Sequence, residues 1–105
     1  MKYTIKRTDT ADGLIRQIIL GIAENFDNET ALAKLDEMEE QINALADNPY
    51  IGVQPRYIAL RRQGYRMLIM EKDLAFYKVD EAKKEVTVYA VVDQRQDYMS
   101  ILRGL

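Results

Sequence analysis

The segment 65–92 reads YRMLIMEKDLAFYKVDEAKKEVTVYAVV and decides the fold. Three runs within it are rich in Val, Ile, Leu, Tyr and Phe and are expected to form strands: 65–70, 74–79 and 85–92. The polar stretches between these runs are short, and a parallel crossover needs roughly a dozen residues or more. The segment therefore predicts an antiparallel β-meander, which the run 57–62 extends by one strand at its N-terminal side.

The N-terminal half has a different periodicity. Residues 2–7 alternate in polarity, as expected for a short strand at or near a sheet edge. Apolar residues then recur at helical spacing, which predicts one helix over 10–25 and a second over 28–46. The few residues between them favour an antiparallel αα-hairpin packed on one face of the sheet. The two prolines of 47–55 end the second helix and mark a connecting loop.

Length and composition limit the function classes. A chain of 105 residues fits one domain, 1–105, of α+β class. The chain has no Cys and no His, so a thiolate nucleophile, a Cys-ligated metal and a histidine proton shuttle are excluded, and neither a metal nor a cofactor is expected. No stretch approaches the length and hydropathy of a membrane span, and no signal peptide is recognisable. We therefore expect a cytoplasmic protein that does not bind membranes.

Charge is distributed unevenly along the chain. Residues 1–50 contain 5 Lys and Arg against 10 Asp and Glu, whereas residues 51–105 contain 10 against 7. Eight acids and one Lys lie between Glu24 and Asp47, so one side of the hairpin is acidic. Between Arg56 and Arg66 there are four arginines and no acid, which favours either a local anion-binding patch or a solvated strand face.

Three blocks in the second half carry a family resemblance. They are GYRMLI at 64–69, LAFYKVDE at 74–81 and VYAVVDQRQDY at 88–98. In order and spacing they resemble the conserved blocks of the RelE/ParE superfamily, the small toxins of bacterial type II toxin–antitoxin modules that are also described as plasmid stabilisation proteins. The resemblance covers nearly the whole chain. It implies an N-terminal strand, an αα-hairpin and a mostly antiparallel meander with the helices on one face.

The resemblance also implies a function and partners. Members of the superfamily are either ribosome-dependent mRNA endonucleases, like RelE, or inhibitors of DNA gyrase, like ParE, and both kinds are neutralised by a cognate antitoxin. The long hairpin favours a ParE-like toxin that inhibits growth by macromolecular binding. The alternatives are a RelE-like endonuclease acting on mRNA at the ribosome, and an inactive toxin-derived interaction domain.

A RelE-like activity would need cations at the scissile phosphate. By resemblance, the candidate catalytic residues are Arg66, Arg95 and Tyr98, and the candidate nucleic-acid or anion-binding residues are Arg61 and Arg62. The sequence predicts that Arg61, Arg66 and Arg95 meet at one site with Tyr98 beside them. The structural alternative is that the arginines pair with nearby acids and that Tyr98 packs on the sheet.

Two features depart from the RelE pattern. Tyr57 and Ala59 stand where RelE-like enzymes have lysines, and Asp93 and Asp97 flank Arg95, which raises the cost of binding a phosphate there. Antitoxin binding requires an apolar groove instead of catalytic residues. We expect that groove on the meander and the C-terminal segment, at Leu68, Met70, Ala75, Tyr77, Met99, Ile101 and Leu102.

Overall fold

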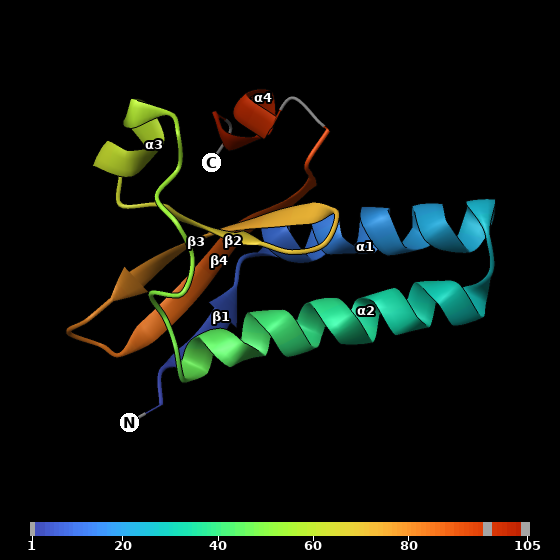
Figure 1. Ribbon diagram of the computed structural model, residues 1–105, viewed down its shortest axis with the longest axis horizontal. Coiled ribbons are helices and arrows are strands. Elements are labelled where there is room, and N and C mark those ends of the chain that lie inside the picture. Colours follow the sequence, from blue (N-terminus) through green and yellow to red (C-terminus); the bar gives the residue numbers. More distant parts are fainter. Residues whose placement is uncertain (1, 96–97, 104–105) are drawn as a thin grey trace.

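The computed structural model describes residues 2–95 and 98–103 and shows an α+β fold around one four-stranded sheet (Figure 1). The sheet has the order β1-β4-β3-β2, and its strands are β1 (Thr4–Arg7), β2 (Arg66–Ile69), β3 (Asp73–Asp80) and β4 (Glu85–Asp93). The meander β2-β3-β4 is antiparallel, as predicted, and β1 adds to β4 in parallel. Both edge strands have four residues, whereas the central strands β3 and β4 have eight and nine.

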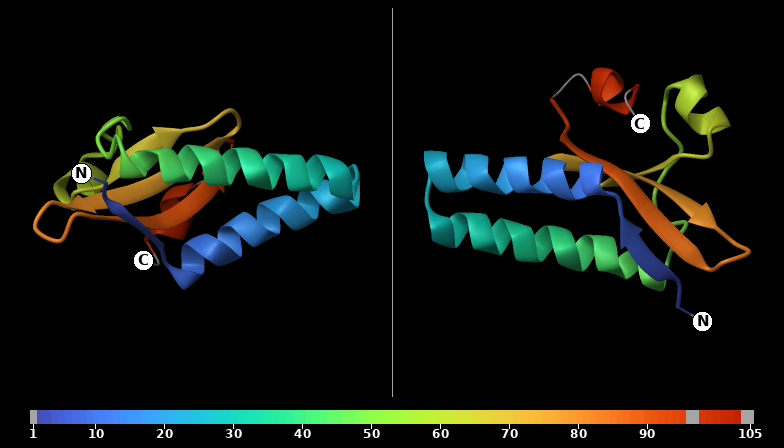
Figure 2. Two further views of the ribbon diagram at one scale, coloured as in Figure 1. Left: turned by 90° about the horizontal axis from the view of Figure 1, so that it is seen from below. Right: turned by 180° about the vertical axis from the view of Figure 1, so that it is seen from behind.

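Two long helices form the predicted hairpin. They are α1 (Asp9–Asn25) and α2 (Asn28–Asn43), and a 3-10 turn, η1 (Ala44–Ala46), follows α2. Each helix begins at a polar cap: the Thr8 hydroxyl accepts a hydrogen bond from the amide of Ala11, and the Asp27 carboxylate accepts one from the amide of Thr30. The hairpin covers one face of the sheet and continues well beyond its end (Figures 1 and 2).

The core beneath the hairpin contains the apolar stripes of both helices. Ala11, Ile15, Met38 and Ile42 are buried there against one face of the central strands, which contributes Ala75, Tyr77, Val86, Val88 and Val91. The alternation along β4 is interrupted between Val88 and Val91, where the register with β3 shifts. Alternation along a strand places the intervening residues on the other face. That second face is also covered.

The opposite face carries two short helices, α3 (Ile58–Arg62) and α4 (Tyr98–Leu102). Leu60 of α3 and Leu102 of α4 pack on Tyr65, Leu74, Phe76, Ala90 and Val92. The expectation that all helices lie on one face was therefore incomplete, because α3 and α4 lie on the other side of the sheet from α1 and α2 (Figure 1).

The prediction of a strand at 57–62 was wrong. These residues form α3, and the amide of Tyr65 donates to the carbonyl of Leu60 while the amide of Gly64 donates to that of Arg61. This is the Schellman pattern that ends a helix, and it requires the left-handed conformation that Gly64 adopts, with φ at 89°. Glycine takes this conformation without the steric cost that a Cβ would impose.

Within the described residues, no helix is long and apolar enough to span a membrane.

Candidate functional site

Arg66 holds the loop that precedes α3. Its Nη2 donates to the carbonyl oxygens of Tyr50, at 2.9 Å, and Gly52, at 2.6 Å, and its guanidinium lies 5.2 Å from the centre of the Tyr50 ring. The same loop pairs with β2 through reciprocal backbone bonds between Val53 and Met67. Arg66 therefore fastens the loop to the sheet edge through Nη2, whereas its buried Nε has no hydrogen-bond partner among the described residues.

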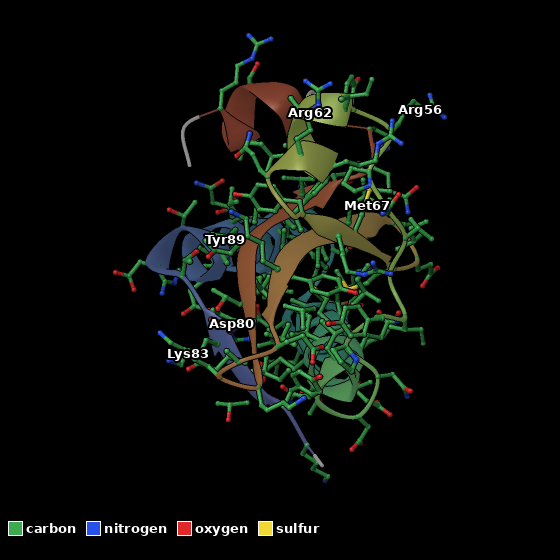
Figure 3. All side chains as sticks on the ribbon, turned by 90° about the vertical axis from the view of Figure 1, so that its left-hand side faces the viewer. Arg56, Arg62, Met67, Asp80, Lys83 and Tyr89 are labelled. Carbon is green, nitrogen blue, oxygen red and sulfur yellow. The ribbon has the colours of Figure 1, made fainter. Side chains whose placement is uncertain are left out.

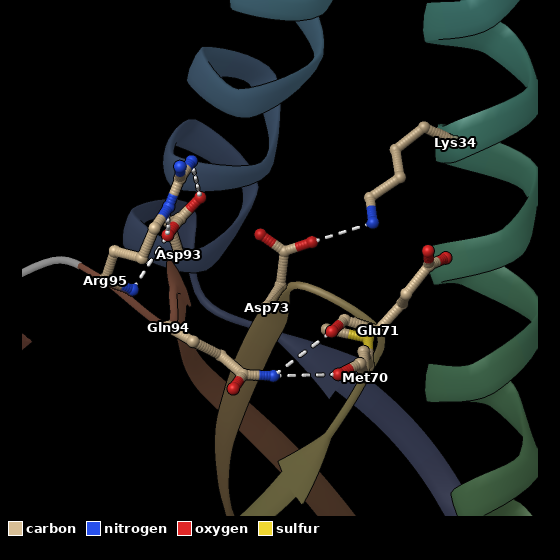
Figure 4. Close-up of polar contacts among 7 residues, drawn as sticks. All are labelled: Lys34, Met70, Glu71, Asp73, Asp93, Gln94 and Arg95. Atoms are coloured by element: carbon tan, nitrogen blue, oxygen red, sulfur yellow. Dashed lines mark hydrogen bonds and ion pairs between the residues drawn. The ribbon is translucent and has the colours of Figure 1, made fainter.

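Arg95 pairs with its neighbour Asp93. The guanidinium Nε lies 3.1 Å from Oδ1 of Asp93, Nη2 lies 3.1 Å from Oδ2, and the Arg95 amide also donates to Oδ1 (Figure 4). These bonds lower the pKa of Asp93 and raise that of Arg95. The adjacent Gln94 side chain donates to the carbonyl of Met70, which ties the end of β4 to the β2–β3 turn. The expectation of an Arg95–Asp93 pair as the structural alternative is confirmed.

Strand register separates the two arginines. Arg66 is opposite Tyr77, which in turn is opposite Val88, whereas Arg95 follows Asp93 at the far end of β4. Five strand steps from Val88 to Asp93 correspond to about 16 Å. The structure therefore does not assemble the predicted site from Arg66 and Arg95.

The remaining members of the predicted anion site lie elsewhere. Arg61 and Arg62 are exposed on α3, over the second face of the sheet, and Figure 3 shows Arg62 on that helix and Tyr89 on the sheet below it. Arg61 donates to the carbonyl of Arg56 at 3.3 Å. The Tyr98 side chain lies outside the described residues. The anion-binding roles of these residues stay predictions.

A cation on the second face is packed between aromatic rings. The ammonium of Lys78 lies 4.5 Å from the Tyr65 ring centre and 5.1 Å from that of Tyr89, and the two rings meet edge to face at 5.5 Å. Burial and the neighbouring Tyr89 raise the pKa of Tyr65. Lys78 is thus engaged by the rings, as cation–π geometry favours.

Most of the predicted antitoxin-binding residues are covered by the chain itself. Met70, Ala75 and Tyr77 are buried beneath the hairpin, and Leu68 packs partly buried beside them. Ile101 and Leu102 pack against the other face of the sheet, and the Met99 side chain lies outside the described residues. The described members of the expected groove therefore lie on two faces of the sheet and are largely buried, and they do not form one exposed surface.

A different apolar groove opens where the hairpin leaves the sheet. It has a volume of about 1140 Å³ and runs along α1, with the β2–β3 turn and the end of β4 opposite. Its lining from α1 includes Leu14, Ile18, Gly21, Ile22 and Phe26. A Cβ built on Gly21 would meet nothing within 4 Å, so the groove is open at this position.

Charged residues close the sheet end of this groove. Lys34 of α2 lies 2.9 Å from the buried carboxylate of Asp73, and Asp73 is directly opposite Asp93 in the register (Figure 4). Like charges directly opposite each other destabilise a sheet. Lys34 and Arg95 compensate them from either side, so this end of the groove offers cations and carboxylates close together.

A second polar network stands at the opposite end of the sheet. The Glu81 carboxylate accepts hydrogen bonds from Tyr50, from Tyr3 at 2.8 Å and from Lys84 at 3.1 Å. These bonds, that of Tyr50 first, lower the pKa of Glu81 to about 2, and the same contact raises the pKa of Tyr50 to about 12. The network joins the N-terminal strand and the 47–55 loop to the β3–β4 turn.

The groove residues were visible in the sequence but were given another role. Ile18 and Ile22 belong to the apolar stripe that predicted α1, and the hairpin as a whole was expected to pack on the sheet. Only the part of α1 above the sheet is buried in that way. A glycine at position 21, beside the apolar stripe, was the available signal for an open position on the helix.

Comparisons with known proteins agree with the resemblance seen in the sequence. Residues 5–98 match the family model described as the ParE toxin of the type II toxin–antitoxin system parDE. No curated protein sequence matches the chain.

Three solved structures are similar in fold. A chain of the chromosomal ParDE system of P. aeruginosa has 21% identity and a TM-score of 0.73, covering 88% of this chain and 96% of its own. A chain of the RelBE2 toxin–antitoxin complex of Mycobacterium tuberculosis has 17% identity and a TM-score of 0.62, covering 90% and 100%. A mutant of the E. coli toxin RelE in the free state has 14% identity and a TM-score of 0.64, covering 100% of both chains.

Proposed function

Because the chain belongs to the ParE toxin family of type II toxin–antitoxin systems, we propose that it is a growth-inhibiting toxin that binds a macromolecular target and is neutralised by a cognate antitoxin. The proposed target is DNA gyrase, and the proposed action is binding without RNA cleavage. The predicted RelE/ParE resemblance is confirmed by the family match. The choice between the two activities depends on the arginines.

One observation carries the choice of binding over cleavage: Arg66 and Arg95 each bond to the chain itself, and the register separates them by about 16 Å along the strands. Phosphate cleavage by 2′-hydroxyl attack requires donors directed together at the developing charge. Arg66 instead donates to two loop carbonyls, and Arg95 to Asp93. The Asp93 carboxylate beside Arg95 also opposes the approach of a phosphate, because both groups are negatively charged.

The groove beside α1 supports antitoxin binding. It presents Ile18 and Ile22 on a long helix, with both signs of charge at its sheet end. An amphipathic helix of a partner fits such a groove, because apolar residues at helical spacing can cover the stripe while polar residues meet the rim. We therefore place the antitoxin contact there and not on the buried meander residues.

Two assays with the purified toxin separate the target hypotheses. We expect inhibition of DNA supercoiling by gyrase, measured on agarose gels, and intact mRNA on translating ribosomes, measured by primer extension. Cleavage at the ribosomal A site that is lost in Arg66→Ala and Arg95→Ala, without inhibition of gyrase, would establish the RelE-like alternative. A folded toxin that affects neither system would favour the inactive interaction domain.

A further inference from the structure

Exposed large apolar side chains of the hairpin gather at its far end. Within the described residues of α1 and α2 and the turn between them, the three such side chains are Leu20, Phe26 and Leu32, which are 52%, 76% and 60% exposed. The segment that carries them, from the last turns of α1 through the first turns of α2, extends past the sheet (Figures 1 and 2). Single exposed leucines are common on protein surfaces, but three at one projecting end form a candidate contact surface.

Acidic residues stand beside these side chains. Glu24 follows Leu20 by four residues on α1, and Leu32 on α2 lies three residues after Glu29 and four before Asp36. Residues at these spacings are neighbours on one helix face. The single lysine between Glu24 and Asp47 is Lys34, which pairs with Asp73 at the groove. The far end thus combines apolar side chains with negative charge.

This surface adjoins the groove proposed for the antitoxin and overlaps it at one residue. Leu20 and Leu32 do not line the groove, and Leu32 is two residues, or roughly 200°, from both Thr30 and Lys34, which do. Phe26 is common to the two surfaces. A partner that fills the groove as far as Phe26 would therefore reach the edge of the far end.

We propose that the far end of the hairpin, which exposes Leu20, Phe26 and Leu32 beside Glu24 and Glu29, is the surface that engages the toxin's target, and that the target presents there a basic protein surface with apolar side chains. This inference rests on the proposed function as a toxin that acts by binding. The negative charge selects against nucleic acid and favours a cationic partner, because charge complementarity steers association and suppresses wrong partners. Burial of Leu20 and Leu32 supplies the apolar part of the affinity.

Charge reversal tests the proposal with a matched control on the same hairpin. The test variant is Glu24→Lys with Glu29→Lys, and the control is Glu37→Lys with Glu40→Lys, exposed residues nearer the sheet end of α2. A second pair compares Leu32→Ser with Ile69→Ser, a 56% exposed residue on β2. Each variant is assayed for growth arrest, for gyrase inhibition and for binding to the product of the adjacent reading frame.

The expected result is a loss confined to the far end. The Glu24/Glu29 variant and Leu32→Ser should abolish growth arrest and raise the concentration needed to inhibit gyrase by about tenfold or more, as for a contact at the centre of an interface. Inhibition by the wild type should weaken with added salt, and this dependence should fall in the Glu24/Glu29 variant. Binding to the adjacent gene product should stay within about threefold of wild type.

Other results would refute the far-end surface, the gyrase assignment or both, and each outcome tells these cases apart. Far-end variants that inhibit gyrase as well as their controls refute the surface but not the function. Lost binding to the adjacent gene product with intact gyrase inhibition would assign the surface to the antitoxin. Lost self-association in the same variants, measured by size-exclusion chromatography, with intact gyrase inhibition would assign it to a second copy. If the wild type arrests growth without inhibiting gyrase and the variants abolish the arrest, the far-end surface is supported and the gyrase assignment is wrong. A wild type that neither arrests growth nor inhibits gyrase would overturn the surface and the proposed function together.

Discussion

Replacing Arg66 with Ala should lower the free energy of unfolding and should not remove a catalytic group. The change deletes two bonds from Nη2, 2.9 Å to the Tyr50 carbonyl and 2.6 Å to the Gly52 carbonyl, together with the contact to the Tyr50 ring. Hydrogen bonds from a charged donor contribute about 1.5–3 kcal/mol each. Since the site is partly exposed, solvent reduces this, and we expect a total loss of about 2 kcal/mol.

Urea denaturation followed by circular dichroism measures this loss. Arg62→Ala on α3 is the control, because an exposed substitution away from such contacts changes stability by less than about 0.5 kcal/mol. Arg66→Ala should lower the urea midpoint, and the folded variant should inhibit gyrase like the wild type. Unchanged stability together with weaker nucleic-acid binding would refute the structural role of Arg66.

Three further changes test the groove, the loop and the polar network. Gly21→Phe should fill the open position in the groove and weaken binding of the adjacent gene product by at least about tenfold in calorimetry. Gly13→Phe is the control and should not weaken binding, because Gly13 lies on the same helix outside the groove and a Cβ there would also meet nothing within 4 Å. Gly52→Ala should lower the free energy of unfolding by about 1–3 kcal/mol, because its Cβ would stand 2.5 Å from a buried phenol oxygen and 2.8 Å from a backbone carbonyl; an unchanged urea midpoint would contradict the close approach. Because the pKa of Glu81 is lowered, ionised Glu81 stabilises the fold fully above the ordinary pKa of 4.5, and this stabilisation is lost as the pH falls towards about 2. Glu81→Gln should therefore reduce the difference in thermal midpoint between pH 5 and pH 2. An unaltered pH profile would show that the network contributes nothing to stability.

The sequence predicted the hairpin and the meander because periodicity reports directly on both. The apolar spacing of α1 and α2 and the short turns between β2, β3 and β4 depend on local geometry. The prediction for 57–62 was wrong because its Tyr, Ile and Leu suit a strand as well as one helical turn. Five helical residues are too few to show a helical period. Gly64, placed as a helix-ending glycine, was the better signal.

The site was less predictable because it depends on long-range placement. Sequence spacing does not give the register of a hairpin, and the register is what separates Arg66 from Arg95 along the strands. Likewise, an apolar stripe shows which face of a helix avoids water but not what covers it. Ile15 is covered by the sheet, whereas Ile22, two turns later, lines an open groove.

Bacterial growth tests the central claim most directly. The chain is expressed from an inducible promoter, alone and together with the product of the adjacent reading frame, and viable counts are followed after induction. If the chain is a toxin that its antitoxin neutralises, we expect growth arrest when the chain is expressed alone and normal growth when the chain and the adjacent product are expressed together. Normal growth with the folded, abundant chain alone, or arrest that the adjacent product does not relieve, would contradict the account.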